Sequence, residues 1–169
     1  MTAIRPVLLL LLAGVAVSAA ACATIKPAAT TVAPLTSAPA PIEGYDWFLH
    51  EDGDEARLAY GLEESDDLRL GLDCRRGAGR LALSAVGEAG AHEIVVESGG
   101  ESQRFPALAE PSEVNDGVFL TAQARTSAPV FQQFRRVRWL AVGAGAARQG
   151  YAPHPAAASG IERFFAFCG

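Results

Sequence analysis

The chain has 169 residues and a formal net charge of −5, and half of its residues are hydrophobic. The net negative charge argues against nucleic acid as a partner. Residues 44–169 are enough for one domain with a substantial core.

The first 21 residues have the pattern of a secretory signal peptide. Their only charged residue is Arg5, residues 7–17 are apolar, and small residues occupy positions 18–21. A charged start, a short apolar run and small residues at the cleavage site are typical of such a signal. As a helix, the apolar run would reach only about 16 Å. It is therefore too short to cross a bilayer core of about 30 Å.

Cys22 follows these small residues directly, in the sequence Ala-Ala-Ala-Cys. This segment resembles the lipobox of bacterial lipoproteins. The resemblance implies that the chain is cut before Cys22, that Cys22 is acylated, and that the lipid anchors the protein to a membrane. Ala23 stands where an aspartate favours retention in the inner membrane, so the resemblance implies an outer-membrane protein that faces the periplasm. The alternative is an ordinary secretory signal, cut after one of the alanines.

Residues 22–43 form a tether in this interpretation. They are rich in Pro, Ala and Thr and carry few large side chains. Such a composition cannot build a packed core and favours extended conformations. We therefore divide the chain into a signal peptide at 1–21, a lipidated tether at 22–43 and one globular domain at 44–169.

Apolar alternation within residues 44–169 predicts a mainly β fold. The predicted strands are 45–50, 56–62, 68–74, 80–85, 93–97, 118–124 and 137–142. A short helix is expected near 129–136, with Ser127 as its cap, and another at 160–168. Residues 143–150 are expected to form a flexible glycine turn. Strands without regular helical crossovers favour an antiparallel sandwich or a partly open barrel, with one internal and one C-terminal helix.

Cys74 and Cys168 are the two cysteines of this domain. Cys74 shares a strand face with three leucines, and Cys168 lies on one helical face with Ile161 and Phe164. Both side chains therefore point toward a core, and an oxidising compartment favours their pairing in a disulfide. Two separate buried thiols are the alternative. The domain is loosely similar to small disulfide-bridged secreted domains of uncharacterised role.

The clearest acidic cluster is 51–55, and we interpret it as a turn between two strands. A weak cation site is the alternative, although the spacing does not fit an EF-hand. His50, His92 and His154 are far apart in the sequence and form no metal-binding motif. We therefore expect neither a metal nor a cofactor. The acids of residues 43–73 are expected to pair with the arginines that follow them.

Function is the least determined property of the sequence. We expect a non-catalytic binding or assembly module of the cell envelope, of which an inhibitor-like protein is one version, with an envelope protein or glycan as partner. The alternative is an envelope hydrolase acting on peptidoglycan or lipid, with Asp66 or Asp67 near a histidine. An exposed apolar surface would favour the first, and a buried acid in a deep pocket the second.

Overall fold

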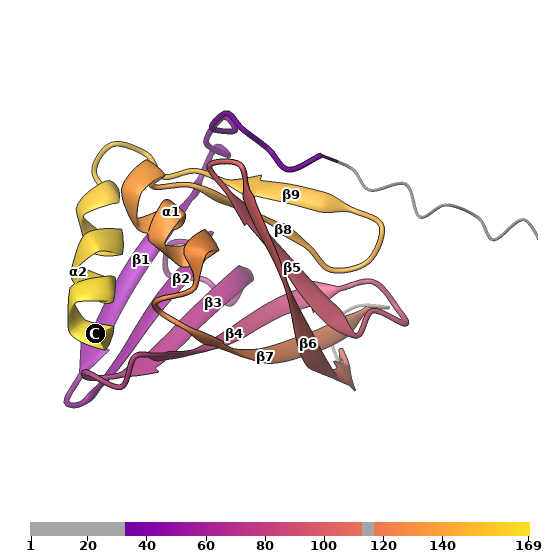
Figure 1. Cartoon of the computed structure of the whole chain (residues 1–169), viewed down its shortest axis with the longest axis horizontal. Coiled ribbons are helices and arrows are strands. Elements are labelled where there is room, and N and C mark those ends of the chain that lie inside the picture. Colours follow the sequence, from indigo (N-terminus) through magenta and orange to yellow (C-terminus); the bar gives the residue numbers. More distant parts are fainter. Residues whose placement is uncertain (1–32, 113–116) are drawn as a thin grey trace, which may run out of the picture. The chain divides into compact units, whose positions relative to one another are not determined.

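A computed structural model describes residues 33–112 and 117–169. Within these residues the chain forms nine strands and two helices (Figure 1). The strands are β1 (Tyr45–Asp52), β2 (Glu55–Leu62), β3 (Leu68–Arg75), β4 (Arg80–Gly87), β5 (Glu93–Ser98), β6 (Glu101–Pro111), β7 (Val118–Arg125), β8 (Leu140–Gly143) and β9 (Arg148–Tyr151). The helices are α1 (Pro129–Val137) and α2 (Ala158–Cys168). Neither helix is long and apolar enough to cross a membrane.

All nine strands belong to one antiparallel sheet, in the order β1-β2-β3-β4-β7-β6-β5-β8-β9. The sheet turns within β6, where Glu101–Pro106 pair with β5 and Ala107–Pro111 pair with β7. This turn folds the sheet back on itself, so that it nearly closes into a barrel (Figure 1). The predicted mainly β fold, a partly open barrel with two helices, is confirmed.

The barrel does not close through strand pairing, because the end strands β1 and β9 do not pair with each other. Aromatic rings bridge this gap instead. Tyr60 of β2 lies 4.7 Å from Tyr151 of β9, measured between ring centroids. The backbone N–H of His154, just after β9, donates to Asp46 of β1 at 3.0 Å. We call this unpaired junction the seam.

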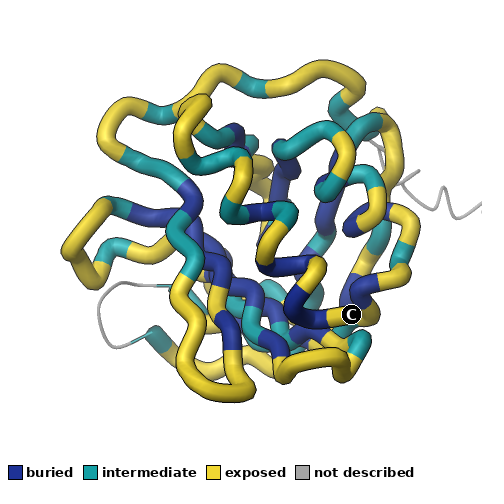
Figure 2. Tube along the Cα trace, turned by 90° about the vertical axis from the view of Figure 1, so that its left-hand side faces the viewer, coloured by how far each residue is buried: buried dark blue, intermediate teal, exposed yellow. Residues whose placement is uncertain are grey.

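Alternation along each strand fills the interior with apolar side chains. In β4, for example, Leu81 and Leu83 are fully buried, whereas Arg80, the first residue of the strand, is exposed. The helices complete the core: α2 packs against β1 and β2, and α1 against β5 and β6. Phe134 of α1 and Phe165 of α2 meet edge to face at 5.9 Å. Figure 2 shows buried residues gathered in the middle of this unit and exposed residues on its turns.

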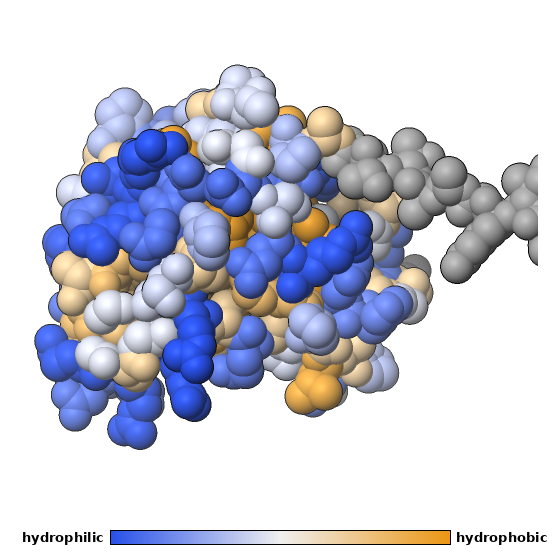
Figure 3. Space-filling model, viewed as in Figure 1, coloured by the Kyte–Doolittle hydropathy of each residue, from blue (hydrophilic) through white to orange (hydrophobic). Residues whose placement is uncertain are grey.

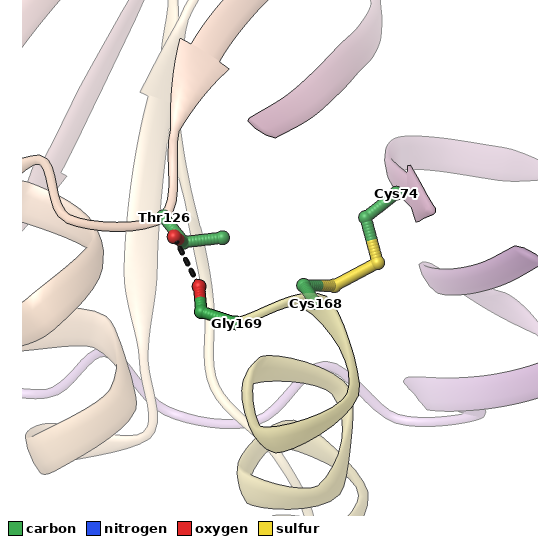
Figure 4. The surroundings of a disulfide bond; sticks show 4 residues. All are labelled: Cys74, Thr126, Cys168 and Gly169. Carbon is green, nitrogen blue, oxygen red and sulfur yellow. Dashed lines mark hydrogen bonds between the residues drawn. A yellow bond between two sulfur atoms is a disulfide. The ribbon is translucent and has the colours of Figure 1, made fainter. Parts of the chain in front are cut away.

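Cys74 at the end of β3 and Cys168 at the end of α2 form a disulfide, with their Cα atoms 5.7 Å apart (Figure 4). The pairing expected from their inward-facing positions is thus present. Backbone hydrogen bonds reinforce the junction, since the N–H of Gly79 donates to the Cys168 carbonyl at 2.8 Å. The Thr126 hydroxyl donates to the Gly169 carbonyl next to it. The disulfide therefore fixes α2 to the end of the sheet where β3 meets β4.

Several local predictions were wrong. Ser127 does not cap α1: the cap position is Ala128, which makes no side-chain hydrogen bond. The helix continues to Val137, and Arg138 then takes a left-handed conformation, so the following strand begins only at Leu140. The expected glycine turn at 143–150 includes the start of β9, and β6 was not predicted at all.

Part of the predicted tether makes defined contacts with the domain. The Leu35 N–H donates to a carboxylate oxygen of Glu97 at 3.0 Å, and its carbonyl accepts from Gly100 at the same distance. Arg148 of β9 donates to the Ala33 carbonyl at 3.0 Å. The described residues, 33–112 and 117–169, accordingly belong to one compact unit. The signal peptide and Cys22 lie outside the described residues.

Candidate functional site

The outward face of β2, β3, β4, β7 and β6 carries the most distinctive surface of the described residues. Strand alternation sets its residues in rows that cross the sheet. One row runs through Ala59, Gly71, Ser84, Thr121 and Leu108, each a register partner of the next. The small side chains in the middle of this row leave the face shallow rather than ridged.

Gly71 explains why part of this row must be small. A Cβ atom at this position would lie 2.4 Å from the Ser84 hydroxyl oxygen on the neighbouring strand. Real side chains do not approach so closely, so alanine would force β3 and β4 apart or move Ser84. The absent side chain leaves room for a small hollow of about 80 Å³, lined among others by Leu68, Val86 and Phe119.

Four large apolar side chains are exposed at and beside this hollow. Leu68 is 39% exposed, Val86 and Phe119 each 42%, and Leu108 76%. Val86 and Phe119 are direct cross-strand partners, and Leu108 follows on the next strand. We call these four residues the apolar patch. Figure 3 shows apolar side chains at the lower edge of the molecule, where the second half of β6 lies in Figure 1.

The two arginines that line the hollow beside the apolar patch are each paired with an aspartate. Arg57 binds Asp73 through two hydrogen bonds, at 2.6 and 3.2 Å. These bonds raise the pKa of the Arg57 guanidinium. Arg69 pairs with Asp67 at 3.0 Å and also donates to the Tyr45 hydroxyl, which raises the pKa of Arg69. Both arginines beside the patch are therefore paired, whereas Arg80 and Arg125, at the other end of β4 and β7, have no ion pair among the described residues.

Beyond the Arg57–Asp73 pair lies a hollow of about 550 Å³ at the β1–β2 turn. His50, Asp52, Glu55, Cys74 and Arg75 are among its lining residues. Its acids and arginines balance, since Glu55 lies 4.0 Å from Arg75. Such a mixed and open lining can hold polar ligands.

The acidic cluster at 51–55 forms the β1–β2 turn, as interpreted from the sequence. Its carboxylates are paired with arginines from later in the chain: Asp54 with Arg76 at 3.5 Å and Glu51 with Arg163 at 3.2 Å. The expected pairing between the acidic and basic parts of the chain is thus found at this turn. Among residues 33–112 and 117–169, no group of three His, Cys, Asp or Glu is arranged to hold a metal ion.

The three histidines stay apart in the fold. His50 is exposed on β1, while ring nitrogens of His92 and His154 each lie 3.3 Å from a backbone carbonyl. Asp67, one of the acids considered for hydrolysis, accepts from the Tyr45 hydroxyl at 2.5 Å and from Arg69. None of the described hydrogen bonds joins Asp66 or Asp67 to a histidine.

Two tyrosines with altered acidity belong to the core rather than to a surface site. Burial raises the pKa of Tyr151 to about 12 and also raises that of Tyr60. Both rings therefore stay neutral at ordinary pH and act as packing groups across the seam. Glu162 differs, because hydrogen bonding to Arg135 lowers the pKa of its exposed carboxyl.

Comparison of the chain with protein-family models, with curated proteins and with solved structures finds no match. The chemistry of the site is therefore argued from its geometry. The apolar patch was missed in the sequence because Leu108 lies on the unpredicted β6, and Val86 and Phe119 meet only through the pairing of β4 with β7.

Proposed function

We propose that this chain is a non-catalytic binding module of the bacterial cell envelope, which docks a partner protein on the apolar patch. The observation that carries the proposal is the exposure of four large apolar side chains on one sheet face. Isolated exposed apolar residues are common on monomers, whereas a contiguous group favours an interaction site. The shallow face around the patch suits a broad protein contact better than an enclosed small molecule.

Charge supports a protein rather than an anionic membrane as the occupant. Binding to anionic lipid depends on unpaired basic residues near the surface. Arg57 and Arg69 beside the patch are both engaged by aspartates, and Glu110 lies directly opposite Phe119 on the neighbouring strand. A neutral apolar surface on another protein is the complement of this arrangement.

The envelope location rests on the N-terminal pattern that ends at Cys22. In this proposal, the lipid on Cys22 anchors the chain in the outer membrane and the domain faces the periplasm. The disulfide between Cys74 and Cys168 supports an oxidising compartment, because such bonds are rare in a reducing cytosol. Intact mass of the chain isolated from bacterial membranes tests the anchor. The expected mature chain starts at Cys22 and carries three acyl groups, and Cys22→Ser abolishes the lipid mass.

Site-specific photo-crosslinking tests the docking surface. A photoreactive phenylalanine analogue replaces Phe119 in the full chain, expressed in a bacterium with its N-terminal residues intact. The matched control carries the analogue in place of Arg136, which is exposed on α1 away from the patch. We expect one discrete adduct from position 119 and none from 136. Excess unlabelled wild type should compete for this adduct, and excess Leu108→Asp should not.

Three outcomes would contradict the proposal. An adduct of twice the chain's mass would show that a second copy occupies the patch. Equal crosslinking from positions 119 and 136 would show that the surface is not selective. Hydrolysis of peptidoglycan or lipid by the purified chain, lost in Asp67→Asn, would favour the hydrolase instead.

A further inference from the structure

A second surface lies where β6 separates from β7. Up to Pro106 the residues of β6 pair with β5, and from Ala107 onward they pair with β7. The last residues of β7 therefore have β4 on one side and no paired strand on the other. A wedge-shaped hollow of about 590 Å³ opens between the two strands. Residues 127–129, at the start of α1, also line it.

Three arginines line this hollow, which we call the arginine wedge: Arg80 from β4, Arg104 from β6 and Arg125 from β7. No acidic residue is among its lining residues. Gln103 and Gln123 add hydrogen-bonding side chains. Arg80 and Gln123 also line the neighbouring hollow at the β1–β2 turn, which differs in having Asp52, Glu55 and Asp73 among its lining residues.

Arg80 and Arg125 are direct register partners on adjacent antiparallel strands. Like charges in this position repel each other and destabilise a sheet. Arg104 is paired with Glu93, but in the part of the chain that the structure describes neither Arg80 nor Arg125 has an ion pair. Arg80 and Arg125 thus oppose each other without a paired carboxylate in a chain whose net charge is −5.

We propose that the arginine wedge binds a phosphate group. The planar guanidinium fork matches phosphate oxygens with two parallel hydrogen bonds, and a dianion between Arg80 and Arg125 would turn their repulsion into attraction. Phe105 and Pro106 give the wedge an apolar wall beside the arginines. The wedge therefore accommodates a phosphate that is free or carried on a small organic ester.

Calorimetric titration of the full chain in a non-ionic detergent tests this site, with ionic strength held constant by sodium chloride. The probe is inorganic phosphate. We expect wild type to bind phosphate and to gain thermal stability from it. Arg80→Gln and Arg125→Gln should each weaken binding at least tenfold. Arg80→Lys, which keeps the charge but loses the fork, should fall between wild type and Arg80→Gln.

Arg136→Gln is the matched control, because it removes the same charge from an exposed position outside the wedge. It should bind phosphate like wild type. A second titration with glycerol phosphate distinguishes the sources of the group: tighter binding of the ester indicates a headgroup-like ligand on the apolar wall, and equal binding indicates free phosphate. Both results support the site.

Stability without any phosphate provides an independent readout. Relief of the like-charge contact should leave the melting temperature of Arg125→Gln equal to or above that of wild type. A clear drop would mean that Arg125 has a structural role and would overturn the proposal. The proposal also fails if neither probe binds wild type, or if Arg136→Gln weakens binding as much as Arg80→Gln.

Discussion

Two parts of the barrel are held together by contacts other than strand pairing. One contact is covalent, and the other is the packing of aromatic rings. At one end, the disulfide between Cys74 and Cys168 fixes α2 to β3. At the seam, Tyr60 and Tyr151 connect β2 and β9 through ring packing. A covalent link acts mainly by restricting the unfolded chain, whereas buried rings stabilise the folded state itself. The two closures should therefore respond to different perturbations.

Removal of the disulfide should have the largest effect. The bond joins residues 94 positions apart, and the chain-entropy model assigns a loop of this length about 4–5 kcal/mol. We expect the double substitution Cys74→Ala and Cys168→Ala to lower the free energy of unfolding by up to this amount in denaturant titrations. A reducing agent should destabilise wild type similarly and leave the double variant unchanged. A double variant as stable as wild type would show that the hydrogen bonds from the Gly79 N–H to Cys168 and from the Thr126 hydroxyl to Gly169 suffice.

Loss of a seam ring should come second. Tyr151 is only 6% exposed, so Tyr151→Ala removes a large buried side chain and should cost about 3 kcal/mol. Tyr151→Phe keeps the ring and should cost less than 1 kcal/mol. Thermal unfolding of both variants measures the difference. An equal loss in the two variants would assign the effect to the hydroxyl rather than to packing.

Alkaline pH should destabilise the seam, but not the end of the barrel that contains the disulfide. Burial raises the pKa of Tyr151 from 10.0 to about 12, so the folded state retains a proton that the unfolded chain releases. Its contribution is fully present below pH 10 and is lost as the pH rises toward 12, by about 2–3 kcal/mol at most. Denaturant titrations at several pH values should show a shallower decline in Tyr151→Phe. An identical decline would place the sensitive group elsewhere, with Tyr60 the next to substitute.

The smallest effect should come from the ion pairs that join the two helices. Glu162 of α2 binds Arg135 at 2.9 Å and Arg138 at 3.2 Å, and all three side chains are partly exposed. Exposed pairs contribute little, so Glu162→Gln should lower stability by less than 1 kcal/mol. Because Arg135 lowers the pKa of Glu162, this contribution should disappear as the pH falls below about 4.5. A larger loss would mean that charge, and not the disulfide, holds α2 in place.

The sequence predicted what depends on local pattern. Alternation located seven of the strands, and the inward positions of Cys74 and Cys168 indicated their bond. In contrast, β6 contains Pro106 and Pro111 and turns between two partners, so its residues show no simple alternation of burial. The four residues of β9 follow a glycine-rich stretch that is typical of a turn.

The apolar patch and the arginine wedge could not be predicted from the sequence, and the reason is different. Arg80 and Arg125 are 45 positions apart in the chain and become partners only because β7, and not β5, pairs with β4. The same pairing brings Val86 to Phe119. Alternation assigns a residue to one side of a strand, but it does not say which strand will lie beside it. Knowledge of register was therefore needed before either the apolar patch or the arginine wedge could be recognised.

The contacts of Leu35 with Glu97 and Gly100 limit how far the domain can lie from an attachment point at Cys22. They hold the chain to the domain from residue 33 onward, so only the stretch between Cys22 and Ala33 can separate the domain from an attachment point. Even fully extended, that stretch spans at most about 40 Å. For a protein attached to a membrane at Cys22, any partner of the apolar patch must come within about that distance plus the width of the domain itself.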